Sequence, residues 1–428
     1  MKISMFTNTY RPHVGGVANS VHSFAQELRS RGFGINIVAP EFEGAEESTD
    51  DVFRVPALQH FNGSDFSVRL PQPGLLSAHI EELEPHLIHS HHPFLLGDAA
   101  MRTAYERQLP LVFTHHTMYE QYTHYVPLDS EALKRFAIQM ATEYCNLCHH
   151  VIAPSESIES LLKKRGVTVP ITTIPTGIDL GFFGGGNREA FRERYRIPHE
   201  AMVVGHVGRL AAEKNLMFLS RAVGRFLTQH SEAVFVVVGD GDHRAEMEKT
   251  LRKVARPEQL VFTGRQTGQD VADAYAGMDV FAFASQSETQ GMVVAEAMAA
   301  GNPVVALDGP GIREVVSKHN GRLLDGEAKE SEFAEALSRL TANPERLWRI
   351  AEEARQSMEP YGLAACTDRL SDLYGRLISE FEAGKTHDLS RWDMLQGRLE
   401  AEWNLLAEKA TALAAAVSDT EATRAVMT

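Results

Sequence analysis

The 428-residue chain is poor in cysteine, in long apolar runs and in positive charge, and each shortage excludes a class of protein. Three cysteines cannot build a disulfide framework, so we expect a reduced, cytoplasmic compartment. No stretch approaches the about 18 apolar residues of a membrane span, and Lys2–Phe6 opens the chain without a signal-peptide core. With 57 Asp and Glu against 42 Lys and Arg, the net charge of −15 argues against nucleic acid as a partner.

The length predicts more than one domain, and an alternation of strand and helix patterns runs along most of it. Short β-branched or aromatic runs alternate with amphipathic stretches, such as 17–31, which is typical of βα units and parallel sheets. The expected strands are 2–8, 35–40, 52–56, 87–90, 111–115, 151–154 and 171–174 in the first half, and 202–207, 233–239, 260–263, 280–284, 303–307 and 321–324 in the second. The fold class is therefore α/β, with two doubly wound, Rossmann-like domains facing a ligand cleft.

A glycine-rich break at Gly181–Asn187 separates the two patterns and predicts a linker. We expect domains at 1–180 and 187–360, a helix at 361–382 that packs back toward the first domain, and an amphipathic helical tail at 383–428. The tail carries a net charge of −2, which is the wrong sign for an anionic membrane. It is expected to pack against the chain itself or against a second copy in a homo-oligomer.

A basic corner follows the first strand of the second domain. The segment Gly208 to Asn215 places Arg209 and Lys214 between a strand end and a helix start, where both can face one anion. The free amides and dipole of a helix N-terminus suit a diphosphate in the same place. An isolated Arg and Lys pair would instead be an ordinary solvated loop.

A second cluster of residues favours the diphosphate interpretation. Glu288 follows the expected strand 280–284, Gly291 starts the next helix, and Glu296 lies within that helix. Two carboxylates beside a phosphate site would repel it unless they bind neutral hydroxyls. Sugar and ribose hydroxyls meet that requirement.

These motifs resemble those of the retaining glycosyltransferases of family 4, which have the GT-B fold. The resemblance rests on Gly208-Arg209 with Lys214, on Glu288 and Glu296 with seven residues between them, on Ala300-Gly301-Asn302-Pro303-Val304-Val305, on the early Gly15-Gly16 loop, on Ile174-Pro175-Thr176-Gly177-Ile178-Asp179 and on Val238-Gly239-Asp240-Gly241-Asp242. It covers nearly the whole chain and leaves out the tail after about residue 383.

The resemblance implies a role for each matching residue. Arg209 and Lys214 would neutralise the departing nucleotide diphosphate, and Gly16 would bring its amide to the diphosphate or the sugar. Glu296 would bind the ribose, and Arg265 would lie beside the base. The donor sugar would be held by Glu288, Gln290 and the amides of Gly291, Met292 and Val293. Catalysis would then be electrostatic, with no metal and no cofactor beyond the nucleotide-sugar substrate. The first domain would bind the acceptor, and His116 would reach the donor sugar.

The segment from His116 to Tyr125, together with the donor loop Ser287 to Gly291, is similar to bacterial diacylglycerol α-glucosyltransferases. That narrower resemblance implies transfer of glucose from UDP-glucose to diacylglycerol in glycolipid synthesis, at the inner face of the cell membrane. Tyr119, Tyr122, His124 and Tyr125 would contact the acceptor. Residues 1–200 hold 17 Lys and Arg against 23 Asp and Glu, so only weak, peripheral membrane contact is expected.

Several functions remain open at this point. The acceptor could be a soluble sugar, a sugar phosphate or an envelope polysaccharide intermediate rather than a lipid. A UDP-sugar epimerase on the same fold would need no acceptor at all. A non-catalytic scaffold would bind a UDP-sugar without turnover.

Three further motifs resemble metal or cofactor sites. Cys145-Asn146-Leu147-Cys148-His149 has the spacing of a haem attachment or half a zinc site, but it lies at the end of an expected helix and predicts packing. His89-Ser90-His91-His92 predicts a polar cleft lining, since no carboxylate nearby completes a ligand set. Asp240-Gly241-Asp242 predicts a turn. No metal site is therefore expected.

Overall fold

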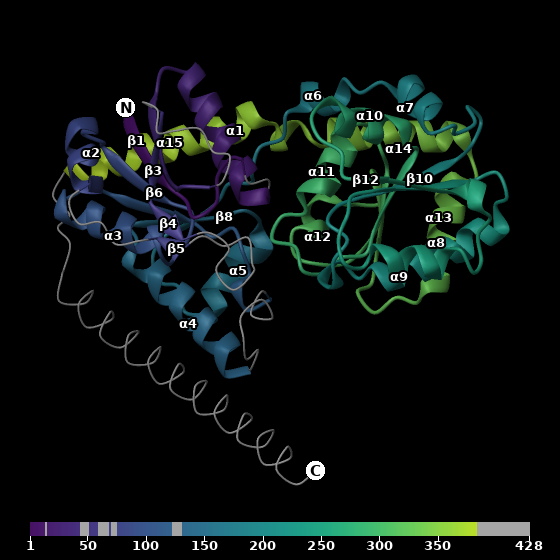
Figure 1. Cartoon of the computed structure of the whole chain (residues 1–428), viewed down its shortest axis with the longest axis horizontal. Helices are drawn as coiled ribbons and strands as arrows, with labels where there is room; N and C mark the ends of the chain where they lie inside the picture. The colour runs from purple at the N-terminus through teal and green to yellow at the C-terminus, as the bar shows by residue number, and fades with distance from the viewer. Residues whose placement is uncertain (13–14, 43–50, 59–67, 70–74, 122–130, 383–428) are drawn as a thin grey trace, which may run out of the picture.

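The computed structural model describes residues 1–12, 15–42, 51–58, 68–69, 75–121 and 131–382, which form two parallel α/β sheets with helices on both faces (Figure 1). The first sheet has the order β3-β2-β1-β6-β7-β8-β9 and the second the order β12-β11-β10-β13-β14-β15. In both, the order reverses beside the first strand, β1 or β10. This is the doubly wound arrangement, and it places the ligand crevice at the carboxyl ends of the strands.

All thirteen expected strands are present, with ends shifted by at most two residues. They are β1 (Lys2–Phe6), β2 (Gly34–Pro40), β3 (Val52–Val55), β6 (Leu87–Ser90), β7 (Leu111–Thr114), β8 (His150–Ala153) and β9 (Ile171–Thr173), then β10 (Val203–Val207), β11 (Val234–Val238), β12 (Leu260–Gly264), β13 (Val280–Phe283), β14 (Val304–Leu307) and β15 (Gly321–Leu324). A short antiparallel pair, β4 (Ala57–Leu58) and β5 (Val68–Arg69), was not expected from the sequence. The expected α/β fold class is confirmed.

The strands form because both faces of each sheet are buried, which favours nearly continuous apolar runs. In β11, Val234, Val236 and Val238 enter the core on one face, while Phe235 and Val237 enter the core on the other. The first sheet is likewise covered on both faces.

The covering helices fill the segments between the strands. Those of the first half are α1 (Gly16–Ser30), α2 (Leu75–Leu83), α3 (Leu96–Glu106), α4 (Glu131–Leu147) and α5 (Glu156–Lys164), and those of the second are α6 (Leu180–Gly184), α7 (Arg188–Arg194), α8 (Leu216–Gln229), α9 (Arg244–Leu251), α10 (Gln269–Gly277), α11 (Met292–Ala299), α12 (Ile312–Val315), α13 (Glu330–Thr341) and α14 (Pro344–Gln356). The expected helix at 17–31 corresponds to α1.

The last described helix, α15 (Leu363–Glu382), runs back from the second sheet to the first (Figure 1). Its residues Leu370, Leu373 and Tyr374 are buried in the same core as Ile3 of β1 and Val21 of α1. This last described helix therefore joins the second half to the core of the first. The expected tail at 383–428 lies outside the described residues.

The glycine-rich segment 181–187 is more ordered than the linker that its composition predicts. It contains most of α6, and a Cβ on Gly186 would lie 2.1 Å from the carbonyl oxygen of Ala272 in α10. Gly186 therefore allows close packing against α10. Composition alone does not separate this role from flexibility.

Candidate active site

The predicted phosphate corner is built where β10 and β11 end beside each other. The Gly208 amide donates to the Val238 carbonyl (3.0 Å), and the Leu210 amide donates to the Asp240 carbonyl (2.9 Å). Gly239 has φ of 137°, and a Cβ there would lie 1.9 Å from the carbonyl oxygen of Gly208. Only glycine permits this approach, so Asp240-Gly241-Asp242 belongs to a loop that supports the segment carrying Arg209.

The structure brings Arg209, Lys214 and Glu288 into one corner. Arg209 is half-exposed and forms an ion pair with Glu213. The Nζ atom of Lys214 lies 2.7 Å from Oε1 of Glu288, and both side chains are largely buried, with 17% and 15% exposed. The Ser285 hydroxyl donates to the same Glu288 oxygen (2.7 Å). Carboxylates thus hold both cations in place.

The helix that follows this corner begins at the glycine that the motif requires. Gly291 precedes α11 with φ of 74°, a left-handed conformation, and a Cβ there would lie 2.2 Å from Cδ1 of Ile312. The amides of Met292 and Val293 lie in the first turn, where a helix has no backbone acceptors of its own. This terminus therefore offers amide donors beside Lys214 and Glu288.

Replacing Gly291 with alanine is expected to destabilise the fold. The left-handed backbone and the clash with Ile312 together should lower the free energy of unfolding by about 2 to 4 kcal/mol. Urea unfolding of Gly291→Ala measures this. Gly375→Ala is the control, because Gly375 lies inside α15 with open space at its Cβ position, and alanine there should stabilise by about 0.5 to 1 kcal/mol. Equal unfolding midpoints for the two variants would contradict the argument.

Glu296, which the resemblance assigns to the ribose, lies in the second turn of α11. It is partly buried, and its Oε2 accepts a hydrogen bond from the Tyr275 hydroxyl (2.8 Å). Burial raises the pKa of the Glu296 carboxyl, and the Tyr275 hydrogen bond offsets part of that rise. Tyr275, which reaches Glu296 from α10, was not predicted from the sequence.

Gln290 lies at the contact between the two halves of the chain. Its Oε1 accepts from the Thr176 amide (2.7 Å) and its Nε2 donates to the Thr176 carbonyl (2.9 Å). The hydroxyl of Thr176 lies 3.0 Å from the hydroxyl of Ser20 in α1. The amide of Gln290 therefore ties the donor loop to the domain junction, and its predicted contact with the donor sugar stays a prediction.

His116 follows β7, and the structure places it against the donor loop of the other half. Its carbonyl oxygen accepts a hydrogen bond from the Thr289 hydroxyl (2.9 Å), and the Thr289 carbonyl accepts one from the Ser155 hydroxyl (2.6 Å). The His116 imidazole contacts His91, with Nε2 and Nδ1 2.9 Å apart. Burial lowers the pKa of His116 well below its usual value, which keeps the ring neutral.

The Glu314 carboxylate adds a further contact between the halves. It accepts hydrogen bonds from the amides of Glu156 and Ser157, both at 2.7 Å, at the start of α5. The negative side chain of α12 thus complements the positive end of α5. These two hydrogen bonds to Glu314, together with the Thr289 and Gln290 contacts, fix how the two sheets face each other.

The remaining predicted residues lie at other edges of the same region. Gly16 starts α1, after β1, and Arg265 is exposed after β12. Tyr119 lies in a short 3-10 turn (Tyr119–Gln121), where its buried hydroxyl has no partner within the described part of the chain. Three acceptor candidates, Tyr122, His124 and Tyr125, lie outside the described residues.

The cysteine motif is buried in and just after α4. Cys145 and Cys148 are free thiols in the core of the first sheet, where burial raises the pKa of Cys148 well above its usual value. Among the residues that the structure describes, no group of three or more His, Cys, Asp or Glu side chains has the geometry of a metal site.

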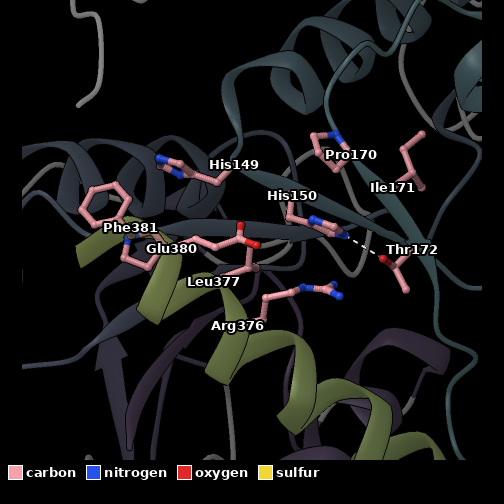
Figure 2. Close-up of a pocket in the computed structure, with 10 residues that line it drawn as sticks. His149, His150, Pro170, Ile171, Thr172, Arg376, Leu377, Glu380 and Phe381 are labelled. Atoms are coloured by element: carbon pink, nitrogen blue, oxygen red, sulfur yellow. Dashed lines mark hydrogen bonds between the residues drawn. The ribbon is translucent and has the colours of Figure 1, made fainter. Parts of the chain in front are cut away.

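A surface hollow of about 420 Å³ lies away from this corner, between the first sheet and α15 (Figure 2). His150 lies at its centre and bonds the Thr172 hydroxyl (2.8 Å), with Arg376 and Glu380 of α15 opposite. The lining residues that the sheet supplies, among them His150 and Thr172, come from the amino-terminal parts of β8 and β9. Since doubly wound sheets bind ligands at the carboxyl ends of their strands, the hollow is not the predicted active site.

Two residues that support the site were not predicted from the sequence: Ser285 and Glu213, which hold Glu288 and Arg209. His91 was predicted to line a polar cleft, and the structure instead buries it against His116. The available signal was positional, since Ser285 and His91 each lie just after the carboxyl end of a strand. Residue type alone did not show which of them would meet.

Comparison with known proteins agrees with this geometry. Residues 14–182 match the model of Glycosyltransferase Family 4, and residues 187–357 match that of Glycosyl transferases group 1. The alpha-monoglucosyldiacylglycerol synthase of Streptococcus pneumoniae is 30% identical over 336 residues, which are 76% of each chain. The chain belongs to the family 4 glycosyltransferases. The family is retaining and metal-independent, and this member transfers a sugar from a nucleotide sugar.

A second relative and a solved structure are also similar to this family 4 enzyme. The GDP-mannose-dependent alpha-mannosyltransferase of Mycobacterium tuberculosis is 28% identical over 367 residues, covering 84% of this chain and 92% of its own. The crystal structure of Anabaena HepE in complex with UDP-glucose superposes with a TM-score of 0.68 at 19% identity, covering 88% of this chain and 100% of HepE. The expected GT-B fold is confirmed. Within the described ranges, no helix is long and apolar enough to span a membrane.

Proposed function

We propose that this family 4 glycosyltransferase moves glucose from UDP-glucose to the free hydroxyl of diacylglycerol, with retention of the anomeric configuration. The observation that carries the proposal is the corner in which Arg209, Lys214 and Glu288 meet the first turn of α11, with His116 bound to the adjoining loop. The Streptococcus pneumoniae relative, named as an alpha-monoglucosyldiacylglycerol synthase, supports the choice of sugar and acceptor.

Each group in the corner has a chemical task in this reaction. The acceptor oxygen bonds to the sugar C1 on the face that the phosphate leaves, and its proton passes to the departing phosphate oxygen. The bond between C1 and that phosphate oxygen breaks ahead of this proton transfer, so negative charge develops on the diphosphate. Arg209, Lys214 and the α11 amides stabilise that charge. Glu288 accepts hydrogen bonds from sugar hydroxyls, Glu296 from ribose hydroxyls, and His116 contacts the sugar from the other half.

A second donor deserves a place in the test, because the Mycobacterium tuberculosis relative is named as GDP-mannose-dependent. The same corner would serve either nucleotide, since a diphosphate is common to both. A reversible, peripheral contact with the inner face of the membrane belongs to the diacylglycerol proposal. The acid excess of residues 1–200 makes that contact weak.

A mass-spectrometric screen tests donor and acceptor together. The purified chain is incubated with UDP-glucose or GDP-mannose, each with dispersed diacylglycerol, with a sugar phosphate, with a soluble sugar, or alone. We expect a monoglucosyl-diacylglycerol from UDP-glucose, with the α-anomer shown by its proton coupling. Glycosylation of soluble acceptors but never of diacylglycerol would contradict the lipid proposal. Conversion of the donor alone would indicate an epimerase, and UDP binding without any turnover would indicate a scaffold.

A further inference from the structure

His91 is a buried histidine just after β6 that contacts His116, the histidine proposed to reach the donor sugar. Its side chain is almost inaccessible, with 2% of the residue exposed. Its Nδ1 lies 2.9 Å from Nε2 of His116, and the two rings stack with centroids 5.2 Å apart. Its other nitrogen, Nε2, has no hydrogen-bond partner in the described part of the chain.

The surroundings of His91 hold its ring in one orientation. The His91 amide donates to the Phe6 carbonyl of β1 (2.9 Å), which fixes its backbone. The His89 ring lies against it, with centroids 4.1 Å apart. His89 is itself bonded on both nitrogens, to the Tyr374 hydroxyl of α15 (2.6 Å) and to the Thr114 hydroxyl (2.7 Å). Nδ1 of His91 therefore stays directed at His116.

When both rings are neutral, the proton shared between them can lie either on Nδ1 of His91 or on Nε2 of His116. Burial lowers the pKa of His91 and of His116 well below the usual value, so neither ring is charged near neutral pH. A neutral pair shares one N–H···N hydrogen bond. If His116 donates it, His91 must carry its own proton on the buried, unpartnered Nε2. If His91 donates it, that Nε2 is a bare lone pair, and an unpaired acceptor is more easily accommodated than an unpaired N–H.

We propose that His91 is a positioning residue that sets the tautomer of His116. His91 donates through Nδ1–H, Nε2 of His116 accepts, and the proton of His116 lies on its Nδ1. No hydrogen bond to that nitrogen is found among the described residues, and the backbone carbonyl of His116 accepts a hydrogen bond from Thr289 of the donor loop. His116 thus presents a neutral N–H donor to an oxygen of the bound sugar nucleotide. The identity of the ligand as a sugar nucleotide rests on the proposed function, whereas the tautomer of His116 does not.

Nitrogen NMR of histidine-labelled protein tests the tautomer without donor or acceptor. We expect the wild-type spectrum to show His116 protonated on Nδ1 and unprotonated on Nε2, with the signals assigned by their loss in His116→Gln. In His91→Phe, which cannot donate, the proton is expected to move to Nε2 of His116, where the face of the Phe ring can accept the N–H. In His91→Asn, whose amide can donate from nearly the same place, it is expected to return to Nδ1.

His150→Phe is the matched control, because it also replaces a buried histidine of the first sheet but lies at the amino end of β8. It should leave the His116 signals in place. A wild-type His116 protonated on Nε2 overturns the proposal, and so does a His91→Phe protein that keeps the proton on Nδ1. The wild-type spectrum decides even if His91→Phe fails to fold.

Kinetics give a second readout. Losing one aligned donor is expected to lower kcat about 10- to 100-fold in His91→Phe, with a smaller change in the KM for the donor and recovery in His91→Asn. A role in packing alone would give Asn no advantage over Phe. If His116→Gln is fully active while the NMR result holds, the assignment of His116 to the sugar fails and the tautomer assignment stands.

Discussion

Replacing Lys214 with alanine is expected to lower kcat/KM for the nucleotide sugar by about 10²- to 10³-fold, and Arg209→Ala should act in the same direction. We expect the larger loss of kcat/KM in Lys214→Ala, because the Lys214 ammonium is mostly buried beside Glu288 while Arg209 is half-exposed. A charge that water screens less stabilises the departing diphosphate more. The loss should appear both in turnover and in UDP affinity, since the diphosphate is present before and after transfer.

Turnover is measured by UDP release and affinity by calorimetry with UDP alone. Arg221→Ala is the matched control, because Arg221 in α8 is also half-exposed and ion-paired, with Glu330 at 2.8 Å, but lies away from the corner. It should retain the activity of the unmodified enzyme. If Lys214→Ala and Arg209→Ala also retained turnover and UDP affinity, the assignment of this corner to the diphosphate would be wrong.

The fold was predictable because its strands are buried on both faces. A run such as Val234 to Val238 is apolar at every position, so it stands out from its surroundings without any knowledge of its partners. The ends of the strands were harder to predict, because adding one residue to a strand changes the composition of its apolar run very little. The glycines at 181–187 show the main ambiguity: Gly186 serves close packing on α10, and the sequence cannot distinguish that from a flexible linker.

The candidate site was predictable where one segment supplies the chemistry. Arg209 and Lys214 lie five residues apart after one strand, and Glu288 and Gly291 follow another, so the rule for strand ends brings them together. The contacts between segments far apart in the sequence were not predictable. Gln290 meets Thr176 across 114 positions and His91 meets His116 across 25, and neither pair has a spacing that a local pattern contains.

Glu288→Gln is expected to lower turnover by about 10²-fold while UDP affinity stays unchanged or rises. The change keeps the shape of the side chain and its bond from Ser285, but it removes the negative charge that Lys214 faces. The Lys214 ammonium then interacts with the diphosphate without competition from a carboxylate. The sugar, in contrast, loses a charged acceptor for its hydroxyls, and charged hydrogen bonds are about twice as strong as neutral ones.

The direction of the UDP affinity change distinguishes two roles for Glu288. If Glu288 acts only by holding Lys214 in place, Glu288→Gln should weaken UDP binding as much as it slows turnover. Adding Glu288→Gln to Lys214→Ala should then lower turnover little further. If Glu288 contacts the sugar, the two losses should combine in Lys214→Ala/Glu288→Gln, because they act on different parts of the donor. Glu330→Gln, which breaks the Arg221 pair on α13, is the matched control and should change neither quantity. Equal losses of turnover and UDP affinity in Glu288→Gln would rule out the sugar contact.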